Sequence, residues 1–303
     1  MAALVALVVI WGYSWVLMKI ALDYSHPFDF AALRVGIAAV LLFAIVAARG
    51  RGFALPRYRM AFLLGTLQVA LFVALSNFAL VYAGPGKTSV LVFTMPFWTL
   101  VFAHFILRER MHGAQWIAVA FAFAGLVLIV APWRLTNVAS SILAVAAGAV
   151  WAISAVLSKK WPTPADPLVF TAWQLLVGTA WLSAIAWGHS HPPVRWTLEF
   201  VVALGFASVL GTGIGWWLWT YVLANTSAGI AGLNSLGIPV IAVLGSAIQL
   251  GERPPPRELT GMIAIGVALG MLGWLGLKRT VPKRESRTLG NGDQPFSSAD
   301  KRR

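Results

Sequence analysis

The sequence contains no cysteine among its 303 residues, and only 11% of its residues are charged. The absence of cysteine excludes disulfides, thiolate nucleophiles and cysteine-ligated metal sites. The scarcity of charge excludes an ordinary soluble domain, in which about 25% of the residues are charged. Most of the surface of this chain must therefore lie in an apolar environment.

Acidic side chains are the scarcer charges, and none lies deep within an apolar run. The ten Asp and Glu residues fall in loops, at the ends of apolar runs or in the C-terminal tail: Asp23, Asp29, Glu109, Asp166, Glu199, Glu252, Glu258, Glu285, Asp293 and Asp300. With neither a paired-aspartate motif nor a His-Glu-x-x-His motif, we expect no metal, no cofactor and no enzymatic activity. Ion-coupled carriers often use an intramembrane carboxylate, so this pattern favours facilitated diffusion, although carbonyls at a broken helix can also bind an ion.

Apolar runs are what the sequence has in abundance, since 59% of its residues are hydrophobic. Each run is close to the ~20 residues that a helix needs to cross a bilayer. The ten runs lie at 2–22, 28–49, 59–82, 87–107, 114–131, 139–159, 168–188, 198–224, 228–250 and 257–278. We therefore predict an all-α membrane protein with ten transmembrane helices.

The second half of the chain repeats the first. Trp, Ser, Val, Leu and Lys recur at an offset of 140 between residues 11–19 and 151–159, and Pro96 returns as Pro239. Because each copy holds an odd number of spans, the second copy should be inverted relative to the first, as in many transporters. The predicted domains are residues 1–133 and 139–278, followed by a disordered cytoplasmic tail at 279–303.

The net charge of +13 is distributed as a membrane topology requires. If the N-terminus lies inside, sixteen Lys and Arg residues fall in inner loops and the tail, and five fall in outer loops. The positive-inside rule then places both termini in the cytoplasm. We expect a lipid bilayer and a small-molecule substrate as partners, and no nucleic acid.

Three glycine-rich segments resemble nucleotide-binding motifs. Residues 84–88 read like the end of a phosphate-binding loop, but Val81 replaces its first glycine and no strand precedes it, so we interpret them as a tight turn. Residues 211–215 and 266–270 lie in apolar runs and indicate close helix packing. The last segment could pack within a monomer or form the contact of a weak homodimer.

Two cations, Lys19 and Arg34, lie within predicted spans. One interpretation is that they form an outer mouth for a substrate carboxylate. The other is a structural clamp on helix-end carbonyls or on Asp23 or Asp29, and we favour it because long cationic side chains reach the membrane surface at low cost. Gln174 takes the place of Arg34 in the second copy, and we assign all three residues a structural or gating role.

Pro96 and Pro239 mark the expected binding site. A proline leaves a backbone carbonyl without its partner, and matched interruptions in two halves point to a site near the midplane, although a packing kink is the alternative. Nearby polar and aromatic side chains are predicted to hold a small, partly apolar, uncharged or zwitterionic solute: Asn77, Phe78, Tyr82, Thr94, Trp98, Trp217, Tyr221 and Asn234. Hydrogen bonds between helices would account for part of this set.

These motifs together resemble the EamA domain of the drug/metabolite transporter superfamily. The similarity rests on Trp11-Gly12-x-Ser14 with Lys19, Pro27-Phe28-x-Phe30 with Arg34, and Pro96-Phe97 with Leu107-x-Glu109-Arg110. Both copies fit, and the second departs at Ala152 and Gln174. The resemblance implies two inverted five-helix repeats in a bacterial inner membrane, alternating access, and export of aromatic or neutral amino acids or similar metabolites.

Three classes of function remain open at this point. A metabolite exporter is favoured, and a nucleotide-sugar carrier is the alternative within that class, which should place several Lys or Arg residues in its cavity. A membrane-embedded enzyme would need a catalytic constellation that the sequence lacks. A channel or structural membrane protein would have no need of an inverted repeat with paired prolines.

The predicted topology can be tested with reporter fusions. Fusions after Arg51 and after Arg303 should report the cytoplasm, and a fusion at Arg195 should report the outside, because Lys and Arg are retained on the cytoplasmic side. An extracytoplasmic C-terminus would contradict the assignment.

Overall fold

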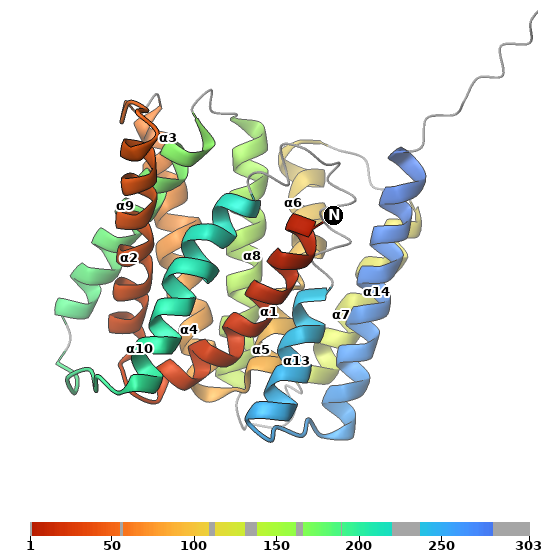
Figure 1. Cartoon of the computed structure of the whole chain (residues 1–303). Coiled ribbons are helices and arrows are strands. Elements are labelled where there is room, and N and C mark those ends of the chain that lie inside the picture. Colours follow the sequence, from red (N-terminus) through yellow and green to blue (C-terminus); the bar gives the residue numbers. More distant parts are fainter. Residues whose placement is uncertain are drawn as a thin grey trace, which may run out of the picture.

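The computed structural model describes residues 2–54, 57–108, 113–130, 138–161, 166–188, 190–219 and 237–280. Within these residues the chain is helical apart from short turns and loops, and no strand occurs. The helices stand side by side between two ends of the molecule (Figure 1). In chain order they are α1 (Ala2–Leu22), α2 (Pro27–Ala48), α3 (Tyr58–Leu64), η1 (Gly65–Leu71), α4 (Phe72–Tyr82), α5 (Pro85–Val92), α6 (Met95–Ile106), α7 (Gly113–Val130), α8 (Val138–Lys160), α9 (Pro167–Trp187), α10 (Leu198–Gly205), η2 (Phe206–Ile214), α13 (Gly237–Gln249) and α14 (Pro256–Thr280).

Seven helical segments of the described residues are long and apolar enough to cross a bilayer. They are Val5–Leu22, Pro27–Ala48, Tyr58–Tyr82, Pro85–Ile106, Val138–Lys160, Pro167–Trp187 and Leu198–Trp219. Shorter apolar helices at Trp116–Gly125, Gly237–Gln249 and Leu259–Ala268 fall within the predicted fifth, ninth and tenth spans. The chain is thus an all-helical membrane protein, and the total of ten spanning helices stays a prediction.

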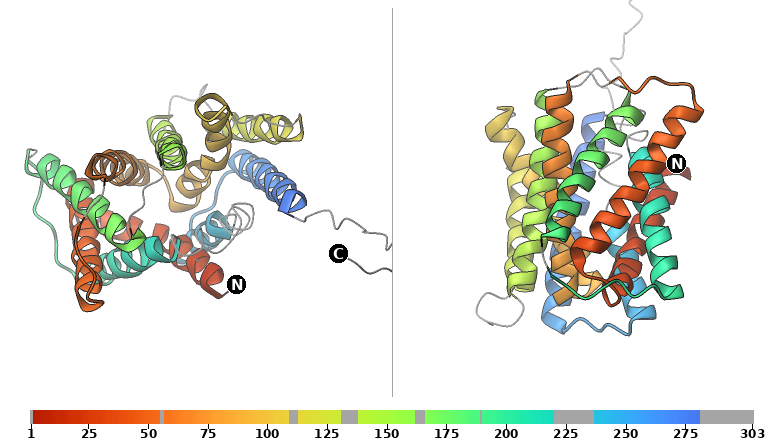
Figure 2. Two further views of the ribbon diagram at one scale, coloured as in Figure 1. Left: turned by 90° about the horizontal axis from the view of Figure 1, so that it is seen from above. Right: turned by 90° about the vertical axis from the view of Figure 1, so that its left-hand side faces the viewer.

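The contacts between helices follow the sequence repeat. α1 packs on α13 and on α10 with η2, and its sequence counterpart α8 packs on α6 and on α4 with η1. α2 packs on its own counterpart α9 at one side of the bundle, and α7 packs on α14 at the other (Figure 2). These contacts of the first copy therefore have matches in the second.

A π-helical segment interrupts the third predicted span and another interrupts the eighth. η1 begins at Gly65 and η2 begins at Phe206, close to the offset of the repeat. In η2 the Thr212 hydroxyl donates to the Ala207 carbonyl, five residues earlier, at 2.8 Å. π-helical turns loosen the regular α-helical bonding and often occur where a helix takes part in function.

The fourth predicted span is interrupted at Pro96. α5 ends at Val92, and α6 begins at Met95 after a two-residue turn. The Thr94 hydroxyl in that turn donates to the Leu91 carbonyl at 2.6 Å, which satisfies one acceptor at the end of α5. Pro96 has no N–H with which to bond Val92, so the break leaves the Val92 carbonyl without its usual helical donor. Pro239 lies in the first turn of α13, and the residues just before that helix are outside the described part of the chain.

Gly148 allows α8 to lie directly against this break. A Cβ atom at position 148 would stand 2.6 Å from the Val92 carbonyl oxygen and 3.5 Å from Thr94 Oγ1. Small residues permit such close helix contacts in membrane proteins, where packing drives association. The shape of the α5–α6 break and the position of α8 therefore depend on each other.

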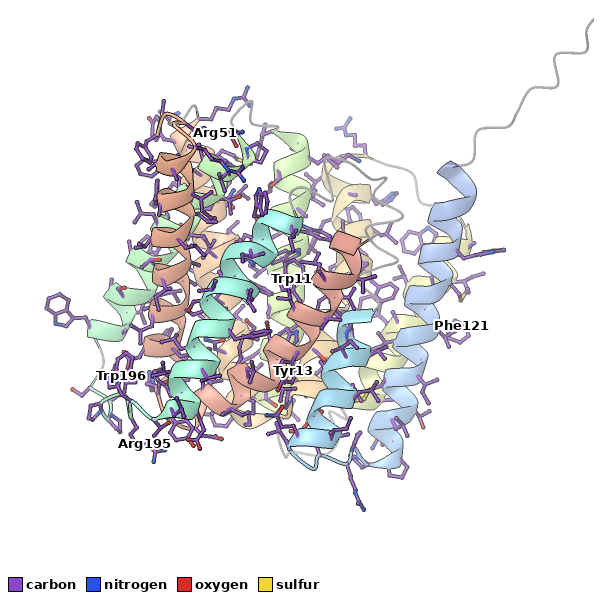
Figure 3. The ribbon with its side chains drawn as sticks, viewed as in Figure 1. Trp11, Tyr13, Arg51, Phe121, Arg195 and Trp196 are labelled. Atoms are coloured by element: carbon purple, nitrogen blue, oxygen red, sulfur yellow. The ribbon has the colours of Figure 1, made fainter. Side chains whose placement is uncertain are left out.

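The loops at the two ends are tied to helix termini. Arg51 and Arg195 lie at opposite ends of the bundle, as the predicted topology requires (Figure 3). Arg51 forms an ion pair with Asp166, the N-cap of α9. At the other end Arg195 donates to the Asp23 carbonyl, and the Tyr24 hydroxyl donates to Glu199 at 3.0 Å, which raises the pKa of Tyr24.

We predict that Gly148→Ala lowers the thermal unfolding midpoint in detergent. The added methyl group meets a backbone carbonyl that cannot rotate away, and overpacking of this kind costs about 1–3 kcal/mol. The matched control is Gly266→Ala in α14, where a Cβ atom would meet nothing within 4 Å. The control should leave the midpoint unchanged or raise it slightly, because alanine is the better helix former. Equal midpoints for the two variants would contradict the packing described here.

Candidate functional site

A cavity of about 80 Å³ lies in the centre of the bundle. Its wall comes from α1, α2, α4, α8 and η2, and from the break between α5 and α6, so both copies of the repeat contribute. Most of the wall is aromatic or apolar: Trp11, Trp15, Met18, Phe72, Val92, Phe93, Met95, Trp151, Ala207 and Trp216. The remaining lining residues are Ser14, Arg34, Gly211 and Thr212.

Trp151 is the centre of the aromatic wall. Its ring meets Phe72 at 4.8 Å and Trp216 at 5.5 Å between centroids, both in edge-to-face geometry, and Trp11 at 6.4 Å. The Trp11 indole N–H donates to the Gly211 carbonyl in η2 at 2.9 Å. Edge-to-face aromatic pairs are favourable beyond the apolar area that they bury, so these rings form a rigid wall against which an apolar side chain can pack.

Arg34 is the one cationic residue among those that line the cavity. Only 8% of Arg34 is exposed, and its guanidinium carbon lies 5.7 Å from the centre of the Phe30 ring. One terminal nitrogen donates to the Met18 sulfur, and buried Nε has no hydrogen-bond partner. No described carboxylate forms an ion pair with Arg34, so the clamp on Asp23 or Asp29 that the sequence suggested is not formed within the described residues.

Lys19 lies at the end of a helix, a position that suits the structural role predicted for it. Its ammonium donates to the carbonyls of Leu80 and Val81, each at 2.9 Å, at the C-terminal end of α4. A cation is favourable there because the helix dipole is negative at that end. Gln174 is buried in α9, where its backbone carbonyl oxygen lies close to Gly65 of η1. Gln174 does not line the cavity.

Two of the predicted substrate-binding residues lie at the junction of α2 and α4. Asn77 is 1% exposed and donates through Nδ2 to the Pro27 carbonyl at 3.3 Å. Phe78 packs its ring on Phe28 at 4.9 Å and on His26 at 6.0 Å. Both side chains thus join helices outside the cavity.

The other predicted residues are dispersed. Trp98 donates to the Thr94 hydroxyl at 3.3 Å and lines a small apolar pocket on the α7 side of the break. The guanidinium carbon of Arg49 lies 5.3 Å from the centre of the Trp217 ring. Tyr82 is 59% exposed. Tyr221 and Asn234 lie outside the described residues, as do Glu109, Arg110 and the tail from residue 281. None of the predicted substrate-binding residues that the structure describes lines the central cavity.

Sequence reasoning missed most of the side chains that form the cavity. The signal was present, because Trp11 and Trp151 are the first residues of the repeated motif and occupy equivalent places in the two copies. A residue that is repeated in both halves and comes to the centre of the bundle can face a shared site. Ser14, three residues after Trp11, also reaches the cavity wall.

A second depression of about 260 Å³ lies beside the turn between α4 and α5. Here Glu252 contacts Gly84 and accepts hydrogen bonds from Ser246 and from the Gly86 amide, and burial raises its pKa. Residues 84–88, the segment that resembles a phosphate loop, are the N-cap and the first helical turn of α5, and a carboxylate from the second copy contacts them.

The comparison with known proteins assigns the family. The model of the EamA-like transporter family matches residues 1–131 and again residues 139–274. This chain belongs to the EamA-like transporter family. The two matches cover both copies of the repeat, and the family is one of membrane transporters.

Two relatives of this EamA-like transporter carry informative names. One is a probable terminal-alkyne amino-acid exporter of Streptantibioticus cattleyicolor, 28% identical over 95% of this chain and 97% of the relative. The other is a probable amino-acid metabolite efflux pump of Salmonella typhimurium, 26% identical over 88% of this chain and 90% of the relative. A protein of known crystal structure, 18% identical, has the same fold, with a TM-score of 0.66 over 92% of this chain and 98% of its own.

We predict that Asn77→Ala lowers the thermal unfolding midpoint without changing substrate selectivity. The variant loses one buried hydrogen bond, worth about 0.5–1.5 kcal/mol. Tyr82→Phe is the control, since this exposed position should tolerate the change. The opposite result, an unchanged unfolding midpoint with altered substrate affinity, would indicate that Asn77 binds the substrate.

Proposed function

We propose that this protein exports amino acids, aromatic or neutral, and similar small metabolites by alternating access of two inverted halves around the central cavity. The observation that carries the proposal is the composition of the cavity wall, to which both copies of the repeat contribute. In transporters of this kind the substrate site lies at the interface of the repeats, beside interrupted helices. The cavity borders such an interruption, since Phe93 and Met95 flank Thr94 in the break before Pro96.

The matched helix contacts support the inverted arrangement. The first helix of each copy packs on the third and fourth predicted spans of the other copy, and the π-helical segments begin at equivalent positions. The loops at Arg51 and Arg195, one from each copy, lie at opposite ends of the bundle. Ten spans, cytoplasmic termini and the inner membrane of a bacterium complete the proposed arrangement.

The chemistry of the wall supports an amino-acid-like substrate. Tryptophan and phenylalanine rings provide an apolar surface, and a few polar groups fix the orientation of a ligand, as is usual in small-molecule sites. Ser14 and Thr212 supply hydroxyl groups, and Arg34 supplies a cation. The names of the two relatives, an amino-acid exporter and an amino-acid metabolite efflux pump, point in the same direction.

A nucleotide-sugar carrier is the alternative, and the wall argues against it. A diphosphate group needs several cationic donors, because each of its two phosphates carries a negative charge at neutral pH. Of the cations in the predicted spans, only Arg34 lines the cavity, while Lys19 is bound to the end of α4. Outside the transporters, the alternative functions are a membrane-embedded enzyme or a channel.

Counterflow into proteoliposomes tests the proposed function. Purified protein is reconstituted with a high internal concentration of an unlabelled amino acid, and the uptake of labelled amino acids and metabolites is followed. A transient accumulation of at least one compound that protein-free vesicles do not show is the expected result. If no compound of a panel that includes neutral and aromatic amino acids exchanges, the proposal fails.

We predict that transport needs neither a proton nor a sodium gradient. None of the ten acidic residues lies deep within a predicted span, and such a residue is the usual coupling group. At zero membrane potential, uptake should approach the external concentration and then stop. Accumulation above that level that an ionophore abolishes would show coupling, for example through carbonyls at the α5–α6 break.

A further inference from the structure

We propose that the central cavity selects solutes that carry one carboxylate and no compensating ammonium, with Arg34 binding the carboxylate. The expected substrates are aromatic or apolar monoanions, such as amino acids that have lost or blocked their amino group. The inference rests on the proposed transport function and, among the proposed substrates, favours the similar small metabolites over free amino acids. It follows from the charges inside the bundle.

The guanidinium of Arg34 has hydrogen-bond donors to spare. Arginine carries five N–H donors in a planar fork. In the structure one nitrogen donates to the sulfur of Met18, which is a weak acceptor, and Nε has no partner although Arg34 is only 8% exposed. A carboxylate can accept two parallel N–H bonds from such a fork, in a geometry that a thioether cannot offer.

Arg34 also forms no ion pair with a described carboxylate, because Asp29, in the first turn of the same helix, pairs instead with His191 Nδ1 at 3.0 Å. All ten acidic residues of the sequence lie in loops, at span ends or in the tail, and this holds for the whole chain. Lys19 cannot relieve the imbalance, because it adds a second positive charge and binds carbonyls of α4. A buried charge without a partner is costly, so the site gains most from a ligand that brings one negative charge.

A zwitterion fits this site less well than a monoanion. Its carboxylate would pair with Arg34, but its ammonium would add a cation to a cavity whose lining residues include no Asp or Glu. An indole face could attract an ammonium, yet the Trp151 ring is already engaged edge-to-face with Phe72 and with Trp216. Removal of the ammonium removes this conflict and keeps the contact with Arg34.

The two ends of the cavity match the two ends of such a solute. Met18, beside Arg34, and Trp11, beside Trp151, both belong to α1. Seven residues separate them, which corresponds to roughly 10 Å along a helix with a rise of 1.5 Å per residue. A carboxylate at the Arg34 end and a ring at the Trp151 end span this distance. The cation is single because the second copy has Gln174 in place of arginine, buried against η1.

The test compares four ligands that share a phenyl ring on a two-carbon chain and differ in charge. They are 3-phenylpropionate (monoanion), phenylalanine (zwitterion), 2-phenylethylamine (cation) and 3-phenylpropionamide (neutral). Binding to the purified protein is followed by the fluorescence of the tryptophans that line the cavity, and transport by counterflow. We expect 3-phenylpropionate to bind at least tenfold more tightly than phenylalanine, and 2-phenylethylamine to bind most weakly.

Arg34→Gln is the decisive variant, because the equivalent position of the second copy already holds glutamine. It should weaken the binding of 3-phenylpropionate at least tenfold and leave the binding of the neutral amide unchanged. Unchanged binding of the amide distinguishes the loss of a carboxylate contact from a general loss of structure. Arg34→Lys keeps the charge without the planar fork and should retain part of the preference. If Arg34→Gln does not fold, the order of affinities of the wild-type protein and of Arg34→Lys for the four ligands still tests the inference.

Two outcomes would overturn the inference. One is wild-type protein that binds and exchanges phenylalanine as well as 3-phenylpropionate. The other is an Arg34→Gln variant that weakens all four ligands equally. In both cases exchange of phenylalanine would leave the proposed export function intact. If neither these ligands nor the amino-acid and metabolite panel exchange, the transport function itself fails.

Discussion

The interior of a bilayer offers no water, so every polar group within a span has to find its partner in the protein. Most of the structure follows from that constraint. Hydroxyl groups return to their own helix, as Ser76 does to the Phe72 carbonyl at 2.6 Å and Ser154 to the Val150 carbonyl at 2.7 Å. Lys19 closes the end of α4, and Thr94 closes the end of α5. Within the described spans, Arg34 Nε and the Thr88 hydroxyl are buried without a partner, and of these two residues Arg34 lines the cavity.

The same constraint explains where helices approach most closely. Helices in a membrane gain nothing from the exclusion of water, so they associate by packing and by hydrogen bonds. Glycine at 148 brings α8 against the carbonyl that the break at Pro96 leaves without a helical donor. The break, the close contact and the cavity therefore form one structural unit, in which a change in any part would alter the space available to a solute.

The helices, the repeat and the family could be predicted from the sequence, because a long apolar run and a recurring motif are local signals. The cavity could not. Its wall is built from Trp11, Trp151 and Phe72, and among runs that are apolar on all sides, nothing in the sequence distinguishes a ring that faces the centre from one that faces lipid. Asn77 looked functional because a buried amide is rare in a membrane, yet it bonds the Pro27 carbonyl. The sequence left two roles open for Arg34, since the absence of an ion pair with a described carboxylate becomes visible only in three dimensions.

The position of Arg34 has an electrical consequence. Its charge lies within the membrane field and forms no ion pair with a described carboxylate. A unit charge that crosses the full potential involves about 2.3 kcal/mol per 100 mV. When the cavity is empty, any rearrangement that moves the aqueous boundary from one side of Arg34 to the other does part of this electrical work, and a bound monoanion cancels it. The voltage across the membrane then acts mainly on the unloaded protein, and an inside-negative voltage favours the state in which Arg34 is open to the cytoplasm.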